Sequence, residues 1–426
     1  MSSKDKKAKK PHNNHHHSKG VVPPPKKSKN KKDKKVKKEK SSSKAQTCAS
    51  NASLRSQDIK TRNRKEELST DGGPLLPSIN GSDTCKEKAI PPGSASPSTP
   101  TAPSTPTGLP ACQTAAKSPW KGEEVALCYI GKFDGATARM EYTEACAGSV
   151  VNVERDCILW KKNLYKNQSD SYPIIDSNIV KIPNHPEDYV NMSSILVPHC
   201  RYPVLMGQMP KRGFEEEFWK ATFYESVVMM YVLMGKEDER NDFFPSSAGA
   251  YVYYGSMFVN IRKVEKMDEE RTRYTIEVLP NGLSNSLMVN VYVHSGWEPF
   301  GVPIKFANTT RSVVDVMNFV KTSNGTEKML VVSRNGCGRA GYFLALGAAF
   351  CCLNDNSEPR LMEIVKSIRL QRPHAVDSMK QYASLYMCIL YYIKKKVSIP
   401  EGMRQRIEDA TKSFEILMRE DLSILY

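Results

Sequence analysis

The chain has 426 residues and a formal net charge of +16, from 62 Lys or Arg and 46 Asp or Glu residues. The first 120 residues hold 25 basic and 9 acidic residues and carry the whole excess, whereas residues 121–426 hold 37 of each kind. This division excludes a uniformly basic globular protein and indicates a basic tail before a neutral domain.

Residues 1–119 are expected to form a disordered tail. Lysine dominates residues 4–10 and 26–40, and Ser, Thr and Pro dominate residues 91–110. Such segments contain too little apolar surface to offset the entropy that is lost on ordering. Lysine runs without aromatic residues attract nucleic acid or an anionic membrane with no sequence specificity, and the same tract could act in nuclear import or only keep the protein soluble.

The cysteines and the apolar runs set further limits. The chain has 11 Cys, and no pair or quartet of them has zinc spacing. No export signal opens the sequence, so reduced thiols are expected rather than disulfides. The longest apolar run, Tyr342–Leu353, is shorter than the ~18 residues that indicate a membrane span. We therefore expect a cytoplasmic protein, or a nuclear one given the Lys-rich tail, with no cofactor, metal or transmembrane segment.

From Trp120 onward, strand and helix patterns alternate, which is typical of an α/β or α+β domain with a mixed sheet and flanking helices. We expect a domain at 120–396 and a helical extension at 397–426. Strands are expected at Val227–Leu233, Tyr251–Lys263, Tyr274–Leu279, Leu287–His294 and Glu327–Val332, and helices at Phe218–Tyr224, Arg311–Thr322, Tyr342–Leu353, Pro359–Arg369, Ser378–Lys394 and Glu401–Arg419.

The segment 333–341 carries the clearest chemical signal. A buried strand leads into a glycine-bearing turn that opens an apolar helix, so successive backbone N–H groups and a helix N-terminus point at one place. Gly336 and Gly338 permit the tight backbone, and Arg339 can offer two parallel N–H donors to an oxyanion. The candidate phosphate-binding residues are Ser333, Arg334, Asn335, Gly336, Cys337, Gly338 and Arg339.

This segment resembles the signature of the receptor and non-receptor protein-tyrosine phosphatases, which is His-Cys, five residues, Arg, Ser or Thr, and Gly. Aligned on Gly338–Gly341, the family's cysteine falls on Ser333, its histidine on Val332 and its Ser or Thr on Ala340. Further landmarks occur in the family's order at Lys162–Tyr165, Asp188–Asn191, Arg201–Pro210, Phe218–Trp219, Phe243–Pro245, Trp297–Pro303, Gln371–Pro373 and Gln381–Tyr382.

The resemblance implies the family's fold, but it places unsuitable residues at the reacting positions. The nucleophilic cysteine is Ser333, the general-acid aspartate is Pro299 and the water-positioning glutamine is Asp377, whose negative charge would repel a phosphoenzyme. A serine hydroxyl needs an adjacent base, which neither Val332 nor Ala340 supplies. Two fallback groups are Cys337, as nucleophile, and Glu298, as acid.

The same resemblance implies that phosphate binding can outlast catalysis. Arg339 and the glycines remain, and Tyr165 aligns with the family's tyrosine that stacks on a phosphotyrosine ring. Arg334 and Asn335 replace small residues and could crowd the loop. The sequence thus favours a catalytically degenerate member, similar in layout to nematode phosphatase-like proteins, which binds a phosphotyrosine protein or a kinase without hydrolysing it. The alternatives are an active but atypical tyrosine phosphatase and a scaffold with a decayed pocket.

Overall fold

The computed structural model describes residues 120–185, 187–236, 238 and 243–420. The expected disorder of residues 1–119 and the expected contacts of the Lys-rich tract lie outside the described residues. All described residues belong to one compact unit of the chain.

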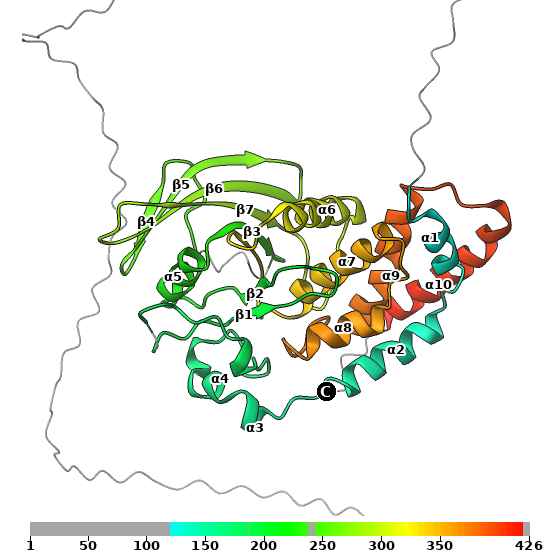
Figure 1. Cartoon of the computed structure of the whole chain (residues 1–426), viewed down its shortest axis with the longest axis horizontal. Helices are drawn as coiled ribbons and strands as arrows, with labels where there is room; N and C mark the ends of the chain where they lie inside the picture. The colour runs from blue at the N-terminus through cyan, green and yellow to red at the C-terminus, as the bar shows by residue number, and fades with distance from the viewer. Residues whose placement is uncertain (1–119, 186, 237, 239–242, 421–426) are drawn as a thin grey trace, which may run out of the picture. The chain divides into compact units, whose positions relative to one another are not determined.

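The centre of the molecule is an eight-stranded mixed sheet (Figure 1). Strands β2, β8, β3 and β7 run parallel, and the remaining neighbours pair antiparallel. The order across the sheet is β1 (Met192–Ile195), β2 (Val204–Gln208), β8 (Lys328–Ser333), β3 (Val227–Leu233), β7 (Leu287–His294), β6 (Arg271–Pro280), β5 (Met257–Lys266) and β4 (Tyr251–Tyr254).

Helices cover both faces of this sheet, with most of them gathered on one side (Figure 1). Short segments precede the sheet, and α5 packs on the face opposite to α6 and α7. The helices are α1 (Glu123–Ile130), α2 (Gly135–Ala147), α3 (Val153–Asp156), α4 (Ile158–Lys162), η1 (Leu164–Lys166), η2 (Asp176–Asn178), α5 (Glu215–Tyr224), α6 (Phe306–Thr322), α7 (Gly338–Asn354), α8 (Leu361–Arg369), α9 (Met379–Lys394), η4 (Glu401–Met403) and α10 (Arg404–Arg419).

The central strands are buried on both faces, which explains their continuous apolar sequences. Along β8, Met329 and Val331 face the core formed with α7, whereas Leu330 and Val332 face the core formed with α5. This alternation follows from the two-residue period of a strand. Nearly every residue of helix α7 is buried inside the larger core. A helix that is buried on all sides has apolar residues on every face, which accounts for the apolar sequence of α7.

The sequence predicted the fold class and most of these elements correctly, with three corrections. The single strand expected at Tyr251–Lys263 is two strands, because the chain turns at Gly255, whose φ is +55°. The helix expected from Arg311 begins at Phe306, and the helix expected from Tyr342 begins at Gly338. β1 and the first helices were not predicted as separate elements, whereas β2 lies within the Arg201–Pro210 landmark, which resembles a strand of the family.

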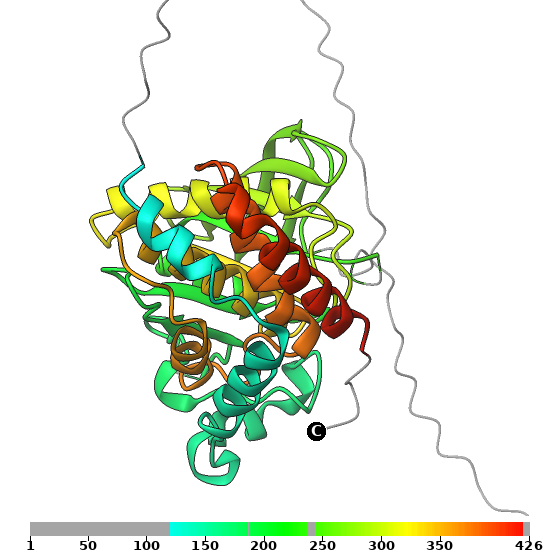
Figure 2. The same ribbon diagram turned by 90° about the vertical axis from the view of Figure 1, so that its right-hand side faces the viewer.

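The last helix packs on the body of the fold. Phe414 of α10 is fully buried and stacks on Tyr386 of α9, with 4.9 Å between ring centroids. Figure 2 shows α10 crossing this side of the molecule next to α2, which it contacts. The boundary expected at residue 396, between the domain and a helical extension, is not tested by this packing and stays a prediction. Within the described residues, no helix is both long and apolar enough to cross a bilayer.

Candidate functional site

The anion loop, which we define as Ser333–Arg339, joins the central strand β8 to the buried helix α7. Because β8 ends at Ser333 and α7 begins at Gly338, the loop lies at the N-terminus of that helix. Gly336 has a φ of +66°, which residues with a Cβ rarely adopt. A Cβ there would also overlap the backbone of Gly207 and Gln208. Glycine is therefore required for this close approach to β2.

A buried arginine outside the loop fixes its backbone. Arg372 is fully buried, and its guanidinium donates to the carbonyl oxygens of Gly336 at 3.0 Å and Asn335 at 3.2 Å. It also donates to Ser193 Oγ at 3.0 Å and to Asn191 Oδ1. The sequence marked Arg372 only as part of a landmark and assigned it no role, since nothing in a polar segment signals that one arginine will be buried.

Ser333 stands where the loop leaves the sheet. The residue is 2% exposed, and its carbonyl oxygen accepts hydrogen bonds from the N–H groups of Met209 at 2.9 Å and Gly336 at 3.0 Å. In the described part of the chain, no carboxylate or imidazole forms a hydrogen bond with its hydroxyl. A serine hydroxyl without such a base is a weak nucleophile at neutral pH.

Cys337, the fallback nucleophile, lies inside the fold. It is fully buried, and its Sγ is 3.3 Å from the carbonyl oxygen of Asn335. Burial raises the pKa of the Cys337 thiol, and the nearby guanidinium of Arg372 acts in the opposite direction with a smaller effect. A buried, protonated thiol does not attack phosphorus, because the thiolate is the reactive form.

Arg339 is held by two contacts from other segments. Its Nη1 donates to Asp238 Oδ2 and to the carbonyl oxygen of Trp297, each at 2.6 Å. Asp238 is fully buried, and Arg334 Nη1 lies 3.8 Å from its other carboxylate oxygen. The sequence did not single out Asp238, which lies 101 residues before Arg339. These bonds fix the plane of the Arg339 guanidinium before any ligand binds.

The segment Trp297–Pro303 lies beside this arginine and carries the position of the missing acid. Trp297 is buried, and Ser378 Oγ donates to the carbonyl oxygen of Phe300 at 3.1 Å. Pro299 has no titratable group. The carboxylate of Glu298 lies against Gly235 and accepts a hydrogen bond from the N–H of Lys236 at 3.2 Å. Glu298, the fallback acid, is thus hydrogen-bonded to the loop that follows β3.

Asp377 packs directly onto the start of α7. A Cβ at Gly338 would overlap the Asp377 carboxylate, so that carboxylate fills the space beside the glycine. The side chain keeps some exposure, but its Oδ1 is buried and has no hydrogen-bond partner among the described residues. Burial raises the pKa of Asp377 to about 7, although Arg339 lowers it. Burial of Asp377 thus favours its neutral form near neutral pH, which reduces the negative charge expected from the sequence.

Tyr165 lies at the rim of the same region. It is 58% exposed, and its ring meets Phe214 edge-on, with 5.6 Å between ring centroids. The next residue, Lys166, accepts a hydrogen bond on its carbonyl oxygen from Gln208 Nε2 at 2.9 Å. Gln208 is the register partner of Ser333 on the neighbouring strand. This hydrogen bond joins the residue after Tyr165 to the strand that neighbours β8.

The described residues contain no group of three or more His, Cys, Asp or Glu that could hold a metal ion.

The protein-tyrosine phosphatase family model matches residues 163–391, which is more than half of the chain. The chain belongs to the protein-tyrosine phosphatase family.

Two relatives within this tyrosine phosphatase family come from Caenorhabditis elegans. The protein C15H7.3, which carries a tyrosine-protein phosphatase name, is 27% identical over 68% of this chain and 73% of its own length. The protein B0280.11, named in the same way, is 26% identical over 64% of each chain. Human receptor-type tyrosine-protein phosphatase alpha is 28% identical over 48% of this chain, which corresponds to only 26% of that receptor.

Solved structures of tyrosine phosphatases share the fold. A structure of PTPN18 aligns with a TM-score of 0.53 and 20% identity over 63% of this chain and 99% of that one. The Trypanosoma cruzi protein tyrosine phosphatase TcPTP1 aligns with a TM-score of 0.54 and 17% identity over 62% and 94%. The mixed sheet and its flanking helices are therefore the tyrosine phosphatase architecture.

In this tyrosine phosphatase domain, Asp377→Asn should change how stability depends on pH. Because the pKa of Asp377 is about 7 in the folded protein against an ordinary value of 3.8, the folded state holds an extra proton between these values. The free energy of unfolding should fall as the pH rises through this window, by up to ~1.4 kcal/mol per pH unit from this group. Urea unfolding between about pH 4 and about pH 7 should show this slope in the natural protein and a smaller one in the variant. Equal slopes would contradict the assignment.

Proposed function

We propose that the protein binds phosphotyrosine-containing proteins through the anion loop without hydrolysing them. The observation that carries the proposal is the combination of an intact binding framework with altered reacting positions. Arg339 is held by Asp238 and by the Trp297 carbonyl oxygen, whereas Ser333 and Pro299 stand where a nucleophile and an acid are needed.

Binding is supported by the hydrogen-bond donors of the loop and of the helix that follows it. The N-terminus of α7 and the backbone N–H groups of a glycine-bearing turn attract an anion, and a positioned guanidinium adds charge-assisted hydrogen bonds. A neutral hydroxyl at Ser333 also removes the negative charge that a thiolate would place against a phosphate. Loss of the thiolate therefore weakens catalysis more than it weakens binding.

The absence of hydrolysis is supported by three independent deficits. Ser333 has no base, Pro299 has no proton to give to the leaving oxygen, and Asp377 lies where the family has a glutamine that positions water. General acid–base catalysis alone contributes roughly 10²–10⁴-fold, and the loss of the nucleophile comes in addition. The buried thiol of Cys337 and the bonded carboxylate of Glu298 do not restore these functions.

The ligand would be a phosphotyrosine protein, and a tyrosine-phosphorylated kinase is one such partner. Tyr165 offers a ring to stack on the phosphotyrosine side chain, which phosphoserine cannot match. A bound phosphotyrosine would be shielded from active phosphatases for as long as the complex lasts. A cytoplasmic location, with a nuclear alternative, agrees with this role and stays a prediction.

A scaffold role with an unused pocket is the second candidate, and one observation favours it. Two carboxylates lie close to the anion loop, because Asp238 pairs with Arg339 and Asp377 covers Gly338. Both oppose an incoming anion when they are ionised. If the repulsion of an anion by these two carboxylates exceeds its attraction to the donors of the loop, the domain binds its partners at another surface.

Titration calorimetry on the full chain tests the proposal. A phosphotyrosine peptide should bind with a dissociation constant in the micromolar range, and its unphosphorylated and phosphoserine versions should bind at least tenfold more weakly. The recovered peptide should still be phosphorylated. Equal affinity for all three peptides would favour the scaffold, and release of phosphate above that of Arg339→Ala would favour an atypical phosphatase.

Tyr165→Ala should separate ring recognition from phosphate recognition. The variant should lose about three- to tenfold in affinity for the phosphotyrosine peptide, since one aromatic contact is worth ~0.5–1.5 kcal/mol. Its affinity for inorganic phosphate should stay unchanged, because Tyr165 belongs to the rim. Competition between phosphate and a labelled peptide measures both values. An equal loss for the two ligands would place Tyr165 in the framework of the loop instead.

A further inference from the structure

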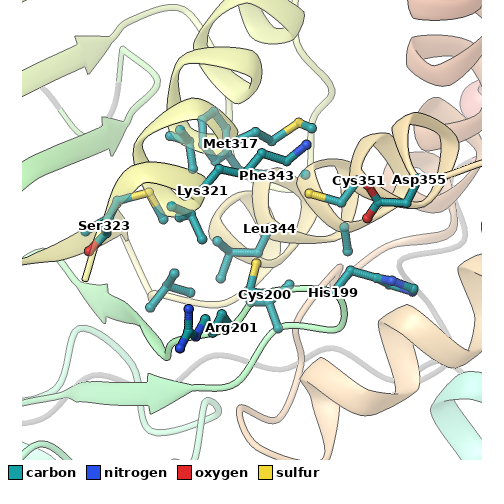
Figure 3. Close-up of a pocket in the computed structure, with 17 residues that line it drawn as sticks. His199, Cys200, Arg201, Met317, Lys321, Ser323, Phe343, Leu344, Cys351 and Asp355 are labelled. Carbon is teal, nitrogen blue, oxygen red and sulfur yellow. The ribbon is translucent and has the colours of Figure 1, made fainter. Parts of the chain in front are cut away.

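A cavity of about 280 Å³ lies along α7, apart from the anion loop (Figure 3). Its walls come from the β1–β2 connection, the C-terminal half of α6 and the middle and end of α7. None of its lining residues belongs to the Ser333–Arg339 loop. The volume is nearly twice that of the ~150 Å³ engineered apolar cavity that takes up benzene. We call this space the α6–α7 cavity.

The floor of the α6–α7 cavity is apolar. Side chains of three elements meet there, namely Val204 of β2, Val316 and Val320 of α6, and Phe343 and Leu344 of α7. Apolar walls of this kind bind hydrocarbon rather than water, because water finds no hydrogen-bond partners on them.

Small residues on α7 leave the space open. Gly347 lines the cavity, and a Cβ placed on it would meet only Val313 Cγ1, at an ordinary contact distance of 3.7 Å. Glycine inside a helix costs about 1 kcal/mol relative to alanine. The neighbouring atoms do not force a glycine at position 347, since there is room for a larger side chain. Gly347 therefore adds to the open space along α7 without any packing contact that requires glycine.

The two ends of the cavity differ in charge. Arg201 and Ser323 line the part of the cavity away from Cys351 and Asp355 (Figure 3), and the Arg201 guanidinium sits 5.2 Å from the centroid of the Tyr202 ring. No carboxylate lies within ion-pair distance of Arg201 in the described part of the chain. The other end holds Lys321 and Asp355. Lys321 lowers the pKa of the Cys351 thiol, and Asp355 raises it. Among the lining residues, the Arg201 end therefore has a formal charge of +1, whereas the end with Lys321 and Asp355 has a formal charge of zero.

The two thiols of the cavity behave as apolar surface. Burial raises the pKa of Cys200 to about 12 and also raises that of Cys351. Both remain protonated at neutral pH and are poor nucleophiles. A ligand here would be held by non-covalent contacts.

We propose that the α6–α7 cavity binds a medium-chain carboxylate, such as a fatty acid of about ten carbon atoms. The hydrocarbon chain would lie on the floor formed by Phe343, Leu344 and Val316. The carboxylate would face Arg201, where the guanidinium can donate two parallel hydrogen bonds. This ligand matches an apolar cavity that has a cation at one end.

Titration of the full chain with decanoate tests the proposal, and decanol serves as the uncharged comparison. The natural protein should bind decanoate with micromolar affinity and decanol about tenfold more weakly. Gly347→Phe should fill the cavity and weaken both ligands at least tenfold, while Gly347→Ala, the matched control, should change decanoate affinity less than threefold. Arg201→Gln should remove the preference for decanoate over decanol.

Two results would overturn the proposal. One is the absence of decanoate binding to the natural protein, and the other is binding that Gly347→Phe leaves unchanged. Circular dichroism establishes whether Gly347→Phe is folded. If it is not, the Arg201→Gln comparison decides, because Arg201 is exposed and its change leaves the core intact. An unchanged preference for decanoate in that variant would likewise contradict the assigned carboxylate position.

Discussion

Ser333→Cys alone should leave the full chain with almost no turnover of phosphotyrosine peptides. The new thiol would lie at the N-terminus of α7, where backbone N–H groups and Arg339 favour a thiolate. A phosphocysteine could form only if the leaving tyrosine oxygen received a proton, and Pro299 has none to give. We expect a rate at least 10³-fold below that of the same loop with a complete acid and water site.

A series of variants restores the missing acid and the missing water-positioning group one at a time. Pro299→Asp on the Ser333→Cys background should raise peptide turnover by roughly 10²–10⁴-fold, and Asp377→Gln should further speed the attack of water on the phosphocysteine, which frees the thiolate and releases phosphate. Phosphate release under conditions of excess substrate measures each step. Large activity from Ser333→Cys alone would show that the fold supplies a proton from another group, and the loss at Pro299 would then explain little.

Arg339→Lys should reduce phosphotyrosine-peptide affinity at least 30-fold, by more than ~2 kcal/mol. Lysine keeps the positive charge that pairs with buried Asp238, but it lacks the planar fork that meets two phosphate oxygens at once. Arg339→Ala should abolish binding and also destabilise the fold by about 3–5 kcal/mol, because it leaves the Asp238 carboxylate buried without its partner.

A surface variant controls for general effects of charge. Arg404 is largely exposed and pairs with Glu401, one turn away on the surface. Arg404→Ala should therefore bind the peptide as the natural protein does and unfold at a similar urea concentration. Calorimetry and urea unfolding on the three variants separate lost recognition from lost folding. Tight peptide binding by Arg339→Lys would indicate that a plain positive charge suffices in this loop.

Much of the fold could be predicted from local sequence patterns. The strand at Glu327–Val332 and the apolar helix at Tyr342–Leu353 could be predicted from their apolar runs, since such runs are local features of the sequence. The turn at Gly255 was missed because the apolar alternation continues across it. A tight two-residue turn changes the direction of a strand without breaking its pattern.

The candidate site was predictable only in part. The landmarks placed Ser333, Pro299 and Asp377 in one region, but they did not indicate that Asp238 would pair with Arg339. Such a pair depends on tertiary packing between distant segments, which no local pattern encodes. The same holds for the charge of Asp377, because its pKa follows from burial against Gly338 and not from its sequence neighbours.

The most direct measurement follows one phosphotyrosine peptide during a long incubation with an excess of the full chain. Native mass spectrometry records the complex, and mass analysis of the recovered peptide records its phosphate. The account predicts a one-to-one complex that persists while the peptide keeps its phosphate, and no complex with Arg339→Ala. Loss of the phosphate at a rate above that of Arg339→Ala would contradict the central claim, as would the absence of any complex.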